Sequence, residues 1–166
     1  MDWTRPALLL ALIGCSGKGD SADSGDSACT GGSPPAIVDL YCENTGIMTY
    51  TPTGEVVPTM TVWADIEDPD GDLTTYSAEI FYDDVIDGSV DTTSSFGTND
   101  GVVEDAEACG VPALFLGTTV FLRGGQPLYE TPYEWGIRVT DASGAVSALA
   151  SVTCTTPDES GEGATQ

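Results

Sequence analysis

TMTVWADIEDPDGDLTTYSAEIFY, residues 59–82, contains two segments of alternating apolar and polar residues joined by a turn. In Thr59–Glu67 every second residue from Met60 to Ile66 is apolar, as expected for a strand with one buried face. Asp68-Pro69-Asp70-Gly71 is typical of a tight turn, because proline presets φ at the second position and glycine closes the turn. Leu73–Tyr82 is the expected partner strand, with one face formed by Tyr76, Ala78 and Ile80.

The alternation begins at residue 36 and recurs toward the C-terminus, and helical periodicity is absent. The segment through Asp87-Gly88 and Asn99-Asp100-Gly101 is rich in turn residues and predicts no definite strand. After a turn at Asp141–Gly144, Ala145–Thr155 is expected to close the domain. Strands punctuated by turns predict an all-β sandwich or barrel. The other predicted strands are Ala36–Glu43, Thr118–Leu122 and Pro132–Thr140.

Two segments, VWADIEDPDGDLTTY (62–76) and YEWGIRVTDASGAVS (133–147), resemble bacterial immunoglobulin-like repeats of the fibronectin type III, PKD and cadherin-like kind. In those repeats strand B ends in a D-P-D-G-D turn, and strand F reads Y-x-W/Y-x-I/V-x-V-x-D-x-x-G and continues into strand G. The chain has Glu79–Asp84 in place of the W-D-F-G-D-G stretch of PKD repeats, and it lacks the L-D-R-E stretch of cadherins. The resemblance implies an immunoglobulin-like antiparallel β-sandwich over residues 36–156 and no particular activity.

The N-terminus has the features of an export signal. The apolar run ALLLALI (7–13) is far shorter than the roughly 20 residues that a membrane-spanning helix needs. Leu12-Ile13-Gly14-Cys15 resembles the lipobox of bacterial lipoproteins, which implies a signal peptide over residues 1–14 and lipidation of Cys15. A generic signal peptide with an incidental cysteine and a buried N-terminal helix are the alternatives. A lipid anchor would place the domain outside the cytoplasm, at the outer membrane or cell surface.

Residues 15–35 predict an acidic Gly/Ser/Asp-rich tether, because SGKGDSADSGDSACTGGS (16–33) has no large apolar residue. Its mean reach over the 18 residues of that stretch is about 23 Å. Spacers of this composition after a lipobox resemble those of myxobacterial surface lipoproteins. Residues 157–166 are likewise predicted to be a disordered tail.

The chain carries a formal net charge of −23, with four basic residues and no histidine. Such a polyanion repels phosphate backbones, so we expect no nucleic-acid partner. Contact with a membrane is expected only through the N-terminal lipid. Envelope proteins or polysaccharides remain as partners, and divalent cations are favoured by the charge. The acidity also serves solubility without any specific role.

Four cysteines remain when Cys15 is set aside, and their three pairings cannot be distinguished by sequence alone. In sandwiches of the type that the resemblance implies, the first and last strands lie close together. We therefore predict a Cys42–Cys154 disulfide, with Cys29–Cys109 following by elimination. A metal site or a nucleophile is the alternative, but neither a C-x-x-C spacing nor a histidine partner is present.

The densest group of carboxylates surrounds the first turn, and a further aspartate opens the last turn. In an immunoglobulin-like topology both turns lie at the same end of the sandwich, so the six side chains are expected to converge. Calcium takes six to eight oxygen ligands, and the group predicts a calcium site. The alternative is that turn chemistry explains the same residues without a metal. The six residues are Asp65, Glu67, Asp68, Asp70, Asp72 and Asp141.

No catalytic residues are predicted, because histidine-based triads cannot form and no G-x-S-x-G, P-loop or Rossmann motif occurs. We expect an envelope protein with a structural, adhesive or assembly role and no catalytic activity. A calcium- or carbohydrate-binding module is the alternative, and an enzyme comes third. An aromatic platform for sugar would need outward-facing rings, which the alternation predicts for Trp63 alone among Trp63, Tyr76, Tyr82, Tyr133 and Trp135.

Overall fold

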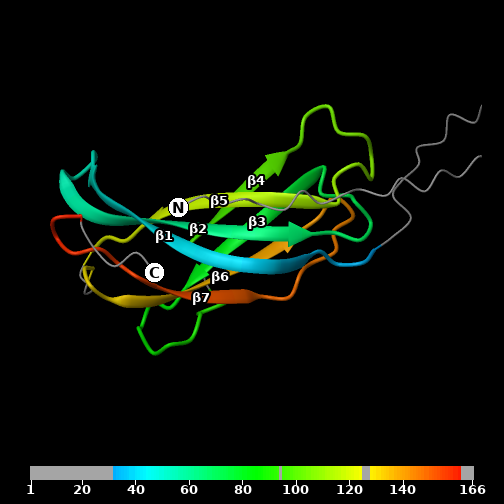
Figure 1. Ribbon diagram of the computed structural model, residues 1–166. Helices are drawn as coiled ribbons and strands as arrows, with labels where there is room; N and C mark the ends of the chain where they lie inside the picture. Colours follow the sequence, from blue (N-terminus) through cyan, green and yellow to red (C-terminus); the bar gives the residue numbers. More distant parts are fainter. Residues whose placement is uncertain (1–31, 94, 125–127, 162–166) are drawn as a thin grey trace, which may run out of the picture.

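The chain forms two antiparallel β-sheets that pack face to face (Figure 1). The structure is a computed structural model that describes residues 32–161, apart from 94 and 125–127. This part of the chain contains no helix, as the sequence predicts. The seven strands are β1 (Ala36–Tyr50), β2 (Glu55–Glu67), β3 (Thr75–Tyr82), β4 (Gly97–Val102), β5 (Ala113–Phe121), β6 (Pro132–Thr140) and β7 (Ala150–Thr155).

The first sheet has the strand order β1-β2-β5 and the second has the order β4-β3-β6-β7. β2 is central in the first sheet, where Trp63 is in register with Tyr41 on one side and Gly117 on the other. In the second sheet β3 and β6 are central, with Tyr82 in register with Trp135. The predicted antiparallel sandwich is therefore present.

The core lies between the sheets and follows the predicted alternation. Every second residue of β2 from Met60 to Ile66 is buried, and the opposing face of β6 is buried from Tyr133 to Val139. Trp135 is the largest fully buried side chain. Two polar residues of β2 are also buried, and their hydroxyl groups are satisfied: Thr59 bonds to the Gly46 carbonyl at 3.1 Å, and Thr61 bonds to the Thr119 hydroxyl at 3.0 Å.

Several strand bounds differ from those predicted. β1 extends to Tyr50 rather than ending at Glu43, because its second half continues the hairpin with β2 past an irregularity at Asn44/Gly46. β4 lies in the segment for which no strand was predicted; it is an edge strand without a fully buried residue, so it shows no apolar alternation. β5 begins at Ala113 and not at 118. β7 begins at Ala150, and the segment from 145 contributes only an isolated bridge.

The predicted disulfide Cys42–Cys154 is present and joins β1 to β7, with a Cα–Cα distance of 6.1 Å. It links the first strand of one sheet to the last strand of the other, at two sheet edges (Figure 1). Cys109 is also disulfide-bonded. Its predicted partner Cys29 lies outside the described residues, as do Cys15 and the predicted signal peptide.

The domain includes residues that the sequence assigned to its flanks. Pro35, from the predicted tether, is buried, and the Ser33 amide donates to Asp70 Oδ2 at 2.8 Å. Pro157, from the predicted tail, is also buried and accepts a hydrogen bond from the Glu130 amide at 3.1 Å. Within the described ranges, no helix is long and apolar enough to cross a membrane.

Candidate metal centre

The turn after β2 is organised by the carboxylate of Asp68. Its Oδ1 accepts the Asp70 amide at 3.2 Å, and its Oδ2 accepts the Asp72 amide at 2.8 Å. The Asp68 carbonyl accepts the Gly71 amide at 3.2 Å, which closes the turn. Gly71 has a φ of +74°, a conformation that glycine adopts without steric cost. The residue types of D-P-D-G-D therefore dictate a loop in which Asp68 and Asp72 are brought together.

A second turn, after β6, places Asp141 against the first. Asp141 Oδ1 accepts hydrogen bonds from the Ser143 hydroxyl and the Ala145 amide, both at 2.8 Å. The Ala142 amide donates to the Asp72 carbonyl oxygen at 3.2 Å and joins the two turns directly. Residues that are about seventy positions apart in the sequence therefore share one end of the sandwich.

Asp68, Asp72 and Asp141 form a compact, buried group of carboxylates. Their exposed fractions are 2%, 3% and 6%, and one oxygen of each lies within 4.8 Å of the others. Two oxygens bound to one calcium ion at about 2.3–2.6 Å can be no more than about 5 Å apart, so the group fits around a single ion. Three carboxylates supply three to six oxygens, and water would complete the shell.

Two oxygens of this group are buried and have no hydrogen-bond partner: Asp72 Oδ1 and Asp141 Oδ2. Asp83 is buried to the same degree, but its two oxygens accept the Asp87 amide at 3.1 Å and the Gly88 amide at 2.6 Å, so both have partners in the backbone. Buried polar atoms are normally paired. The unpaired oxygens therefore indicate that the cluster is suited to a cation, whereas Asp83 is not.

The electrostatics of the cluster point the same way. The pKa of Asp72 is raised from 3.8 to about 6, first by burial, then by a hydrogen bond between its carboxyl group and the Asp68 side chain, and then by the charges of Asp141, Asp68 and Asp70. Neither arginine of the described residues is committed to the cluster, since Arg138 pairs with Glu79 and Arg123 stacks on a tyrosine ring. Within the part of the chain that the structure describes, no basic side chain therefore balances the negative charge of the cluster.

The structure brings together only part of the predicted set of six. Asp65 and Glu67 point away from the core, on the outward face of β2, and do not belong to the group of three. The alternation explains this, because odd-numbered residues of β2 share the face of Trp63. Asp70 lies beside the group and is occupied by the Ser33 amide.

A loop that the residue pattern does not predict covers this end of the sandwich. The Val111 amide donates to the Gly71 carbonyl, and the Asp68 amide donates to the Pro112 carbonyl, each at 2.8 Å. A Cβ atom at Gly71 would lie 2.5 Å from the Cys109 carbonyl oxygen. The glycine is therefore required by close approach of this loop as well as by its φ, and the disulfide-bonded Cys109 lies directly against the turn.

A different feature occupies the outward face of the β1-β2-β5 sheet. The ring of Trp63 stacks on that of Phe115, with centroids 5.0 Å apart and planes 5° apart. Trp63 also lies across Gly117, where a Cβ atom would come within 2.2 Å of the indole ring. Phe115 is 54% exposed, and Tyr41, in register with Trp63, is 42% exposed. The outward orientation of Trp63 follows the predicted alternation, and the neighbouring rings extend it into an aromatic surface.

These features define a two-sheet antiparallel β-sandwich with a buried carboxylate cluster at one end. No protein-family model matches the chain, and neither curated protein sequences nor solved structures yield a match.

Proposed function

We propose that this chain is a non-catalytic, lipid-anchored protein of the cell envelope whose sandwich has a structural, adhesive or assembly role and binds calcium at its tether-side end. The observation that carries the calcium assignment is the pair of unpaired, buried oxygens on Asp72 and Asp141. Asp68, Asp72 and Asp141 would hold the ion, which would neutralise their mutual repulsion. Export and lipidation are supported by the signal-like N-terminus and Cys15.

We assign the sandwich to the immunoglobulin-like kind on the basis of strand order and sequence resemblance. The immunoglobulin fold has neighbouring strands A-B-E in one sheet and C-F-G in the other. Here β1-β2-β5 and β3-β6-β7 have the same order, and β4 pairs with β3 and not with β5. This places the D-P-D-G-D turn between the second and third strands, as in the repeats that the sequence resembles.

Calorimetric titration of the full chain with CaCl₂, after treatment with EDTA, tests the metal assignment. We expect one saturable site, loss of the heat of binding in Asp72→Asn/Asp141→Asn, and unchanged binding in Asp65→Asn/Glu67→Gln, which removes the same number of charges from the outward face of β2. Absence of saturable heat in the parent protein would overturn the calcium site. Mass spectrometry of membrane fractions separately tests lipidation, which predicts a diacylated N-terminal Cys15 and a soluble Cys15→Ser variant.

Carbohydrate binding is the second candidate function, and the stacked Trp63–Phe115 pair favours it. Flat, exposed aromatic surfaces suit the C–H faces of sugar rings, and the acidic residues beside them exclude anionic polymers. Affinity electrophoresis in gels that contain neutral polysaccharides should show retardation that Trp63→Ala abolishes. Equal mobility of the two proteins in every polymer would refute this candidate.

A further inference from the structure

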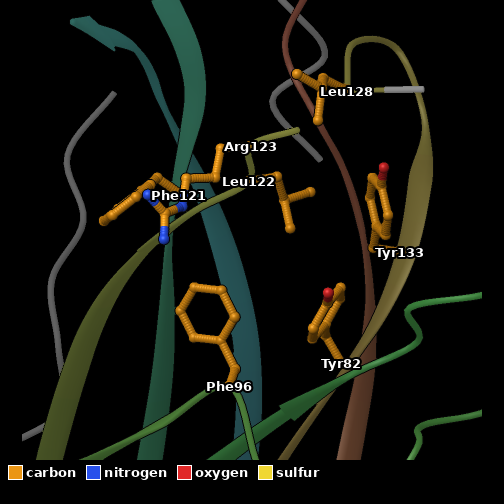
Figure 2. Close-up of a pocket in the computed structure, with 7 residues that line it drawn as sticks. All are labelled: Tyr82, Phe96, Phe121, Leu122, Arg123, Leu128 and Tyr133. Carbon is orange, nitrogen blue, oxygen red and sulfur yellow. The ribbon is translucent and has the colours of Figure 1, made fainter. Parts of the chain in front are cut away.

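A cavity of about 460 Å³, whose lining residues are drawn in Figure 2, opens between the sheets. It lies at the end of the sandwich opposite to the carboxylate cluster, because β6 begins at the cavity and ends at the cluster. Tyr82, at the end of β3, and Tyr133, near the start of β6, form one wall. Leu122, which follows β5, and Leu128 face them. The volume lies within the range of about 300–1,000 Å³ that is typical of small-molecule sites.

The cavity exists because the strands of the first sheet end at different levels. β5 pairs with β2 only as far as Thr59, whereas the hairpin of β1 and β2 continues to Tyr50 and Glu55. The protruding hairpin is held by the segment before β6, since the Tyr129 hydroxyl donates to the Val56 carbonyl at 2.9 Å. The Gly124 amide also donates to Glu55 Oε1, at 3.3 Å. The cavity is thus framed by fixed contacts on the hairpin side.

The lining of the cavity is mainly aromatic. Phe96 packs edge-on against Tyr82, with ring centroids 5.6 Å apart, and both rings contact the fully buried Trp135. Burial raises the pKa of Tyr82 and of Tyr133, so both are neutral phenols at neutral pH. An occupant would therefore meet ring faces and edges together with hydroxyl groups, a lining that suits a planar apolar body.

The cavity also carries an uncommitted positive charge. Of the two arginines in the described residues, Arg138 is paired with Glu79, whereas Arg123 lines the cavity and forms no ion pair within the described part of the chain. Its guanidinium lies 4.7 Å from the centroid of the Tyr50 ring, which orients it, and the residue as a whole is exposed. A stacked guanidinium is pre-organised to bind an anionic group through two parallel hydrogen bonds.

We propose that this cavity binds a small amphiphilic anion, with its apolar body among Tyr82, Phe96 and Leu122 and its anionic group on Arg123. The chain has a net charge of −23, so a non-specific surface would repel such a ligand. Selective uptake of an anion would therefore have to depend on Arg123. The site is separate from the calcium cluster and does not rest on it.

Fluorescence titration of the full chain with 8-anilinonaphthalene-1-sulfonate, an aromatic anion, tests the proposal. We expect saturable, one-site binding that Arg123→Gln weakens by about tenfold, the effect of losing one partly exposed charge-assisted contact. N-phenyl-1-naphthylamine, a neutral probe of similar shape, should bind Arg123→Gln and the parent protein equally. Arg138→Gln, which removes the arginine that is paired with Glu79, is the matched control and should leave the affinity for the anion unchanged.

Filling the cavity provides the second arm. Leu128→Trp should abolish the binding of both probes and retain the near-ultraviolet circular dichroism of the parent protein, which shows that the variant is folded. If Leu128→Trp unfolds, Leu122→Trp fills the same cavity from an independent position. Anion binding that is unsaturable, equal in Arg123→Gln, or retained in both filled variants would overturn the proposal. An affinity for the neutral probe that matches that for the anion would also overturn it, because the cavity would then select only for apolarity.

Discussion

Replacing Asp72 by asparagine should change the stability of the protein in opposite directions with and without calcium. The rise of its pKa from 3.8 to about 6 means that the ionised carboxylate costs the native state roughly 3 kcal/mol at neutral pH. Asparagine has nearly the same shape and no charge, so in EDTA the Asp72→Asn variant should be more stable. Because the amide must still be buried, we expect about half of that cost to be recovered, or roughly 5 °C in melting temperature.

Calcium reverses the order. A site with a dissociation constant of about 0.1 mM, typical of the tighter extracellular modules, gains roughly 2.7 kcal/mol at a hundredfold excess of free ion. The parent protein should gain this in about 10 mM calcium, whereas Asp72→Asn should gain little. Differential scanning calorimetry of both proteins in EDTA and in calcium gives four melting temperatures, with Asp65→Asn as the charge-matched control. If Asp72→Asn melts below the parent protein in EDTA, or gains as much from calcium, the reasoning fails.

Three further outcomes follow from the same structure. In EDTA the native state should bind more protons than the unfolded chain between pH 3.8 and about 6, because the pKa of Asp72 is higher in the native state. The free energy of unfolding, measured with urea, should therefore fall as the pH rises through this window. A free energy that rises with pH would contradict this prediction. Replacing Cys42 and Cys154 by alanine opens a loop of 112 residues and should cost roughly 4–5 kcal/mol, so an unchanged denaturation midpoint would refute the entropic account. Gly71→Ala should lower the free energy of unfolding by about 2–3 kcal/mol, and Gly54→Ala should lower it by about 1 kcal/mol. Both glycines have a positive φ, but of the two only Gly71 would place a Cβ atom 2.5 Å from a backbone oxygen. Equal decreases for the two variants in urea denaturation would refute the role of close approach.

The parts of the fold that could be predicted are those in which each strand has one buried and one exposed face. β6 and residues 59–67 of β2 alternate clearly, so their positions and the outward orientation of Trp63 could be read from the sequence, whereas the start of β2 at Glu55 could not. β4 could not, because its sequence GTNDGV pairs through the backbone at a sheet edge and has no residue in the core. β4 is paired through backbone hydrogen bonds, which leave no pattern in residue type.

The carboxylate cluster shows a similar division. The approach of Asp141 to Asp72 could be expected from topology, since both turns follow strands that end on the same side of the sandwich. The inclusion of Asp65 and Glu67 in the same set conflicted with the alternation of β2 itself, which places both residues on the outward face. The cavity had no signal in the sequence, because Phe96 and Leu128 reach it from segments outside the strands.

The proposed calcium site and the proposed anion site lie at opposite ends of the sandwich. β6 runs from the cavity at Tyr133 to the cluster at Asp141, and strand geometry over that length gives a separation of roughly 27 Å. At the cluster end, the Ser33 amide donates to Asp70 Oδ2, which joins the start of the described residues to the turn that calcium would stiffen. The binding free energies at two sites this far apart are expected to be independent of each other, unless an element with two alternative conformations connects the sites. Saturating calcium should therefore raise the melting temperature and leave the affinity for 8-anilinonaphthalene-1-sulfonate unchanged; a shift of tenfold or more in that affinity would show that the two ends are coupled.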